Sequence, residues 1–144
     1  MNGMVALHNK VRAGATPTPN PPLTPFTWSE EDAKVAQAWA DKCEYNHNPD
    51  NGGRGENIFA SGGAASAEAV VKAWADEAAQ YTYETNKCSG VCGHYTQIVW
   101  SSTTALGCAM KACTTGSPFK GFPNWELWVC NYSPPGNYQG KRPY

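Results

Sequence analysis

The chain has 144 residues, of which 41% are hydrophobic and 16% are charged, and its formal net charge at pH 7 is -1. This length and composition are typical of one globular domain with its own core and exclude a disordered chain. Because Lys and Arg form no run, a nucleic acid or an anionic membrane held by bulk electrostatics is excluded as a partner.

Residues 4–14 predict the first helix. Met4, Leu7 and Val11 recur at helical spacing, which marks an apolar stripe that should face the core. His8 lies beside this stripe. We expect it to be a hydrogen-bonded structural histidine, because an isolated histidine is seldom a metal ligand.

A proline-rich segment and a second helix follow. Five prolines over residues 15–26 exclude a helix or a central strand and predict an extended surface loop. Ser29 is a suitable N-cap for a helix with an acidic first turn. In that helix Val35, Trp39 and Cys43 fall four residues apart, so we expect Cys43 to end the buried stripe.

The middle of the chain carries three polar side chains that need an explanation. A turn-rich loop contains His47, and the short strand predicted at residues 56–60 begins with Glu56. A third helix is predicted over residues 66–81, and Glu77 projects onto its apolar face. An inward carboxylate there needs a partner, because an unpaired buried charge is costly; the alternative is that Glu77 lies at the edge of the stripe and reaches water.

The segment CGHYTQIVW, residues 92–100, raises a choice about His94. Its last three residues, which are apolar, are expected in the core. From the residues alone, His94 is a buried structural histidine, a metal ligand or a catalytic base, and these three interpretations stay open.

The last third of the chain is strand-like. Residues 105–113 and 125–133 predict two strands joined by a loop that contains Gly and Pro. If the two strands pair antiparallel, Cys108 and Cys130 lie about equally far from the centre of the loop. That register would place them opposite each other, which suits a disulfide between the strands.

The six cysteines include no Cys-x-x-Cys pair, so three disulfides in an oxidising compartment are favoured over a zinc ribbon or reduced thiols. Cys113 points to the opposite face of its strand from Cys108 and is free for a cysteine outside the hairpin, for which Cys43 qualifies. Cys88 and Cys92 then remain as a small local loop. Other connectivities stay open at this point.

Targeting segments are not evident in the sequence. No apolar stretch approaches the roughly 20 residues of a membrane-spanning helix, so we predict no transmembrane segment. The first ten residues lack the apolar region of a signal peptide. We therefore expect either a cytosolic protein or a mature domain behind a processed start, and the cysteines favour the second.

Four stretches, in order along the chain, resemble the motifs of the CAP superfamily, which comprises cysteine-rich secretory proteins, antigen 5 and group 1 pathogenesis-related proteins. They are LHNKVRAG, GENIFAS, GHYTQIVW and CNYSPPGNYQGKRPY, and they span residues 7–144. The run CSGVCGHYTQIVW, the six cysteines and the ending RPY are most similar to the plant-type pathogenesis-related group.

This resemblance implies one α+β domain over residues 1–144, a three-layer α-β-α sandwich with a central antiparallel sheet. It implies the disulfides Cys43–Cys113, Cys88–Cys92 and Cys108–Cys130. It also implies a polar cleft lined by His47, Glu56, Glu77 and His94. Two imidazoles there can bind zinc or another divalent cation, with the glutamates holding their other N–H groups; the alternative is a metal-free hydrogen-bonded tetrad.

The function implied by the resemblance is that of a secreted, non-enzymatic protein that binds a sterol or a fatty acid, with a role in antimicrobial defence or host interaction. The sterol-binding segment maps to residues 80–92, where Tyr81, Tyr83 and Val91 would supply apolar contacts; ordinary packing is the alternative for both tyrosines. A metal-dependent hydrolase on the His/Glu cleft is a second hypothesis, although no HExxH or nucleophile motif occurs. The third is the precursor of a signalling peptide, residues 134–144.

Overall fold

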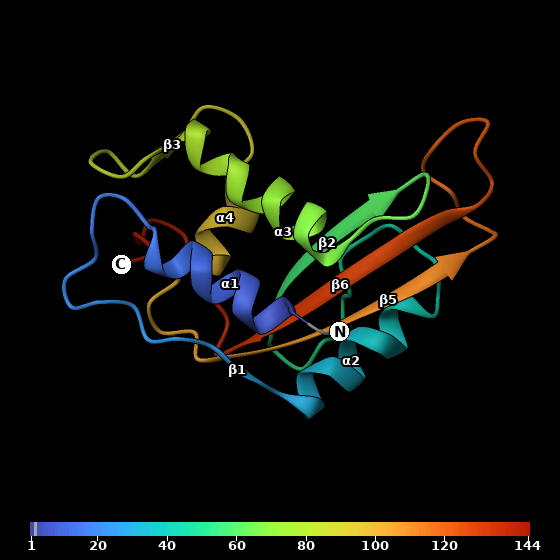
Figure 1. Ribbon diagram of the computed structural model, residues 1–144, viewed down its shortest axis with the longest axis horizontal. Helices are drawn as coiled ribbons and strands as arrows, with labels where there is room; N and C mark the ends of the chain where they lie inside the picture. Colours follow the sequence, from blue (N-terminus) through green and yellow to red (C-terminus); the bar gives the residue numbers. More distant parts are fainter. Residues whose placement is uncertain (2) are drawn as a thin grey trace.

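The computed structural model describes Met1 and residues 3–144 (Figure 1). The helices are α1 (Met4–Ala13), α2 (Glu30–Ala40), α3 (Ala67–Ala75) and α4 (Gly93–Ile98), with a 3-10 helix, η1 (Asp76–Gln80), directly after α3. The strands are β1 (Thr27–Trp28), β2 (Gly55–Ser61), β3 (Tyr81–Thr82), β4 (Lys87–Cys88), β5 (Ala105–Cys113) and β6 (Trp125–Ser133).

The central sheet has four strands in the order β1-β5-β6-β2. Strands β5, β6 and β2 pair antiparallel, as predicted, and β3 and β4 form a separate two-stranded hairpin. The two-residue β1 pairs parallel to β5, so the sheet is mixed instead of wholly antiparallel. The parallel pairing of β1 follows from the path of the chain. After the proline-rich segment the chain runs along the edge of β5 for two residues and then turns directly into α2.

Helices cover both faces of this sheet, which confirms the three-layer architecture (Figure 1). Helix α2 packs on one face, and α1, α3 and α4 lie on the other. Because side chains alternate along a strand, β6 supplies both cores. The β6 residues in the core under α2 are Trp125, Leu127 and Val129. Those in the core under α1, α3 and α4 are Trp128, Cys130 and Tyr132.

All six cysteines form the three expected disulfides. Cys108 stands opposite Cys130 in the β5–β6 register, as the spacing from the loop predicted. Cys113 points to the α2 side and bridges to Cys43. The predicted end of the second helix was wrong, however: α2 stops at Ala40, and Cys43 lies beyond it with a left-handed φ of 53°.

The buried face of α1 differs from the predicted apolar stripe. Met4, His8 and Arg12 are the buried residues of this helix, whereas Leu7 and Val11 are only half-buried. Two polar side chains therefore occupy core positions while two apolar ones are left at the surface. The core accepts this arrangement only because both polar groups are fully hydrogen-bonded there.

His8 is the structural histidine that we expected. Its Nδ1 donates to the Met4 carbonyl at 2.8 Å, and its Nε2 accepts from the Tyr132 hydroxyl at 2.7 Å. The Tyr132 oxygen in turn accepts from Asn57 Nδ2 at 3.1 Å. Both imidazole nitrogens are used in the neutral form, so the ring has no remaining donor or acceptor for a metal.

We expect His8 to make the fold sensitive to acid. Burial lowers its pKa from 6.5 to about 4, against the opposing effect of the Met4 hydrogen bond. In the unfolded chain the imidazole keeps its ordinary pKa, so on acidification the unfolded state takes up this proton first. The free energy of unfolding should therefore be undiminished above pH 6.5 and fall by about 3 kcal/mol as the pH drops to about 4.

Denaturant unfolding measured over this pH range tests the prediction. A His8→Leu variant should be less stable at pH 7, because the Met4 carbonyl and the Tyr132 hydroxyl lose their partner, but its stability should change much less between pH 6.5 and 5. Parallel losses in wild type and variant would assign the acid sensitivity to other groups.

Candidate functional site

His94 and Glu77 form the first candidate pair. Glu77 Oε2 accepts from His94 Nδ1 at 2.6 Å, and the Trp74 ring stacks on the imidazole with 5.9 Å between ring centroids. The side chains of His94 and Glu77 are 25% and 13% exposed, so the pair lies at the surface end of the core. Glu77 is thus the inward, partnered carboxylate that its helical position allowed.

The local sequence explains why Glu77 reaches this position. Helix α3 ends at Ala75, earlier than predicted, and the chain tightens into η1, which carries Glu77. Helix α4 has no acidic residue in its first turn and no side-chain cap. Glu77 Oε1 supplies both, because it accepts from the backbone N–H groups of His94 at 2.9 Å and Tyr95 at 3.0 Å.

His47, on the loop before β2, and Glu56, in β2 itself, form a second pair. Glu56 Oε1 accepts from His47 Nδ1 at 2.7 Å and from the Asn48 backbone N–H at 2.9 Å. This hydrogen bond raises the pKa of His47 above its ordinary value. His47 is 65% exposed, whereas Glu56 is only 4% exposed and its Oε2 is buried without a hydrogen-bond partner among the described residues.

The two pairs flank the same stretch of β2. Asn57, the residue after Glu56, donates from Nδ2 to the His94 carbonyl at 3.1 Å. Over Met1 and residues 3–144, no three His, Cys, Asp or Glu side chains gather closely enough to hold a metal ion. The structure therefore brings each of the two histidines to one of the two glutamates, and the single four-residue cleft stays a prediction.

The three residues expected to contact lipid differ in their surroundings. The Tyr81 hydroxyl donates to Asn86 Oδ1 at 2.7 Å, so it closes the β3–β4 hairpin. The Tyr83 ring stacks on Tyr144, with 4.8 Å between centroids. Val91 is 58% exposed. Both half-buried tyrosines thus make packing contacts, and Val91 is the most exposed of the three. Lipid contact by these residues stays a prediction.

A feature that the sequence did not predict is an apolar groove of ≈ 530 Å³ between α1 and α3. We call it the α1–α3 groove. Its apolar lining residues are Leu7, Val11, Ala15, Val71, Ala75, Ala78 and Tyr95. Lys10, Glu68 and Lys72 also line it. The half-buried Leu7 and Val11, which were expected in the core, therefore face this groove.

The last eleven residues pack against the domain. The Pro134 carbonyl accepts from the Thr103 hydroxyl at 2.8 Å, and the Gly136 N–H donates to Gln97 Oε1 at 3.0 Å. Further along, the Pro143 carbonyl accepts from the Ser101 backbone N–H at 2.8 Å. These contacts hold residues 134–144 against the domain as a packed tail.

Among the described residues, no helix is long and apolar enough to cross a bilayer. The family model described as "Cysteine-rich secretory protein family" (CAP) matches residues 5–132. Peptidase inhibitor 16 of Mus musculus is 41% identical over 98% of this chain, which spans 28% of that relative's length. Pathogenesis-related protein 1 of Arabidopsis thaliana is 42% identical over 83% of this chain and 71% of its own length.

Solved structures agree with these relatives. The venom allergen-like protein 4 of Schistosoma mansoni superposes with a TM-score of 0.78 at 30% identity, over 98% of this chain and 90% of its own. NaASP2, solved with Zn²⁺, has a TM-score of 0.78 at 29% identity, over 98% of this chain and 82% of its own. The motifs, the three disulfides, the layered fold and these matches together show that the chain belongs to the CAP family of cysteine-rich secretory proteins.

Proposed function

We propose that this chain is a secreted, non-enzymatic CAP domain that binds a sterol or a fatty acid. The observation that carries the proposal is the α1–α3 groove, which leaves the apolar Leu7 and Val11 facing an open space while the polar His8 and Arg12 are buried on the same helix. Exposing apolar surface in this way costs stability unless a ligand covers it. Three disulfides favour an oxidising compartment and therefore secretion.

The chemistry of the groove suits an amphipathic lipid. Side chains from α1, α3, η1 and α4 supply the apolar walls, and Lys10 is an exposed cation beside them. Lys72 also lines the groove, although it already pairs with Asp76 at 2.6 Å. An acyl chain or sterol ring would cover the apolar walls, and a carboxylate would have Lys10 within the same groove.

A matched pair of alanine substitutions tests the groove. Ala78 lines it, whereas the neighbouring, equally exposed Ala79 does not. We expect Ala78→Trp to fill the groove and weaken binding of palmitate or cholesterol at least about tenfold, and Ala79→Trp to leave the affinity unchanged. Equilibrium binding of the radiolabelled lipids to the purified protein gives both values.

Two other results would change the assignment. Loss of binding in Val91→Asp but not in Ala78→Trp would place the lipid at the β3–β4 hairpin, where the sterol segment was predicted. Absence of saturable binding for both lipids would remove the lipid proposal.

We infer a second capacity, the binding of zinc through His47 and His94. Each imidazole is held at Nδ1 by a glutamate, which leaves Nε2 as the metal-binding nitrogen. The buried, unpartnered Oε2 of Glu56 is a ready acceptor for a metal-bound water. The Zn²⁺ in NaASP2 supports the same choice of metal.

Zinc binding should weaken as the pH falls, because only neutral imidazole is a ligand. Because the pKa of His47 is raised, protons begin to compete with zinc for its imidazole at a pH above the ordinary pKa of histidine. Between about pH 7.5 and 5.5 we therefore expect a loss of affinity of at least about tenfold. Calorimetric titration at the two pH values measures it.

The controls for zinc are His47→Ala and His94→Ala. One-to-one binding that survives both substitutions would place the metal elsewhere, and no binding at pH 7.5 would leave the two pairs as structural hydrogen bonds. The same His94→Ala variant addresses catalysis: a non-enzymatic protein shows no turnover of peptide or ester substrates that depends on His94.

A further inference from the structure

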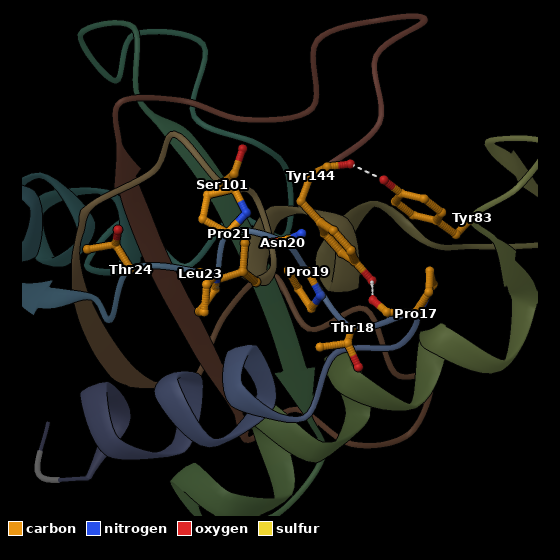
Figure 2. Close-up of a pocket in the computed structure, with 11 residues that line it drawn as sticks. Pro17, Thr18, Pro19, Asn20, Pro21, Leu23, Thr24, Tyr83, Ser101 and Tyr144 are labelled. Atoms are coloured by element: carbon orange, nitrogen blue, oxygen red, sulfur yellow. Dashed lines mark hydrogen bonds between the residues drawn. The ribbon is translucent and has the colours of Figure 1, made fainter.

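The proline-rich segment is part of neither the proposed lipid site nor the proposed zinc site. It forms one wall of a separate pocket (Figure 2). The pocket has a volume of ≈ 490 Å³. Its remaining wall comes from the segment after α4, from the β3–β4 hairpin and from the end of the chain, through Ser101, Tyr83 and Tyr144. None of the residues that line the α1–α3 groove is shared with it.

The proline-rich wall is held in place from both ends. Arg12 donates from Nε and Nη2 to the Thr24 carbonyl at 2.9 and 2.7 Å. The Tyr144 hydroxyl donates to the Pro17 carbonyl at 2.8 Å. Proline fixes its own φ, so a segment with four prolines lining the pocket loses little further freedom when a ligand binds. The pocket is therefore preorganised.

The lining of the pocket combines apolar surface with several uncharged polar groups and carries no charged side chain. Proline carbonyls accept hydrogen bonds, and proline has no N–H that would compete for them. The side chains of Thr18, Asn20 and Ser101 supply hydrogen-bond donors. None of the three takes part in the two hydrogen bonds that Figure 2 marks with dashed lines. Burial raises the pKa of Tyr144, so its phenol also stays neutral at physiological pH.

An aromatic ring completes the pocket. Tyr83 stacks on the Tyr144 ring with an interplanar angle of 25°, and both rings line the pocket. A flat aromatic face beside several hydroxyl and amide groups suits a molecule that has both C–H faces and many hydroxyls. A charged ligand would lose its hydration there without gaining an ion pair.

We propose that this pocket binds a neutral saccharide. A sugar ring would pack on Tyr144 and exchange hydrogen bonds with the Asn20 amide, the Ser101 hydroxyl and the proline carbonyls. Such shallow, uncharged sites bind weakly, and we expect a dissociation constant on the order of 0.1–1 mM. This activity is independent of the α1–α3 groove and of both histidines.

The test uses the purified domain and four tetrasaccharides. Cellotetraose, chitotetraose and maltotetraose are the neutral probes, and tetragalacturonic acid is the acidic comparator; calorimetry to about 5 mM reports binding. We expect saturable binding of at least one neutral probe and weaker binding of the acidic one. Ser101→Tyr should fill the pocket and lower the affinity at least about tenfold, whereas Ser102→Tyr, a substitution outside the pocket, should leave it unchanged.

Asn20→Ala provides a second variant that removes only one amide and should also weaken binding about tenfold. The proposal is overturned if no neutral probe binds, if the acidic probe binds more tightly than all of them, or if Ser101→Tyr and Ser102→Tyr bind alike.

Discussion

Replacing Cys43 and Cys113 together with alanine should lower the free energy of unfolding by about 4 kcal/mol. This bridge has a sequence separation of 70, compared with 22 for Cys108–Cys130 and 4 for Cys88–Cys92. A cross-link that closes a longer loop removes more conformational freedom from the unfolded chain. The bridge also fixes the end of α2 to the end of β5 and so ties one helical layer to the sheet.

The reference for this effect is the pair Cys88→Ser and Cys92→Ser, for which the same dependence on loop length predicts about 2 kcal/mol. Cys108 and Cys130 are both buried, whereas of Cys43 and Cys113 only Cys113 is. Substituting Cys108 and Cys130 would therefore add the larger cavity cost, and this pair is a poorer reference. Denaturant unfolding, with the other bridges kept oxidised, gives the two free energies. A larger loss for Cys88 and Cys92 would contradict the ranking.

Much of the fold follows from local patterns in the sequence. The β5–β6 hairpin was predictable because alternation and a Gly/Pro loop fix its register, and that register alone placed Cys108 opposite Cys130. Ser29 was predictable as an N-cap for a similar local reason, and its side chain accepts the Asp32 backbone N–H. Ser66 caps α3 in the same way. Each of these features depends on interactions between neighbouring residues or across one short loop.

Features decided by tertiary contacts were not predictable from the chain alone. Helix α1 presents Met4, His8 and Arg12 to the core because partners on β6, α4 and the proline-rich segment satisfy the two polar side chains. A rule that buries apolar residues selects Leu7 and Val11 instead, and so misses both the buried network and the α1–α3 groove. The exchange has a visible signal in the sequence, since Met4, His8 and Arg12 also recur at a spacing of four.

The candidate site shows the same division. Periodicity placed Glu77 on the inner face of its helix but did not identify His94 as its partner, because 17 residues separate them. The family resemblance supplied the set of four residues, His47, Glu56, Glu77 and His94, but not which glutamate holds which histidine. The switch from α3 to η1, which lets Glu77 cap α4, depends on the contact between the two elements and leaves no mark in the residues of η1 themselves.

Arg12 is the side chain on which most of these elements converge. It is 2% exposed, and its guanidinium donates to three backbone carbonyls: Thr24, Ile98 and Trp100. It also lies over the Phe26 ring, 4.1 Å from the centroid. Among the described residues no carboxylate pairs with Arg12, so the three carbonyls compensate its charge. One of them belongs to Ile98, the last residue of α4, where the helix dipole favours a cation. Burial lowers the pKa of Arg12 to about 10, which leaves it charged at neutral pH.

Arg12→Met should therefore lower the free energy of unfolding by about 3–5 kcal/mol, because the apolar replacement fills part of the volume but leaves buried carbonyls without donors. Arg12→Lys keeps a charge and loses the fork that reaches several carbonyls at once, so we expect an intermediate loss. The proline-rich segment should also become a site of proteolytic cleavage in Arg12→Met, because the donors to the Thr24 carbonyl are gone. Denaturant unfolding and limited proteolysis measure the two effects. Wild-type stability in Arg12→Met would show that α1 holds the loop and α4 by its apolar contacts alone.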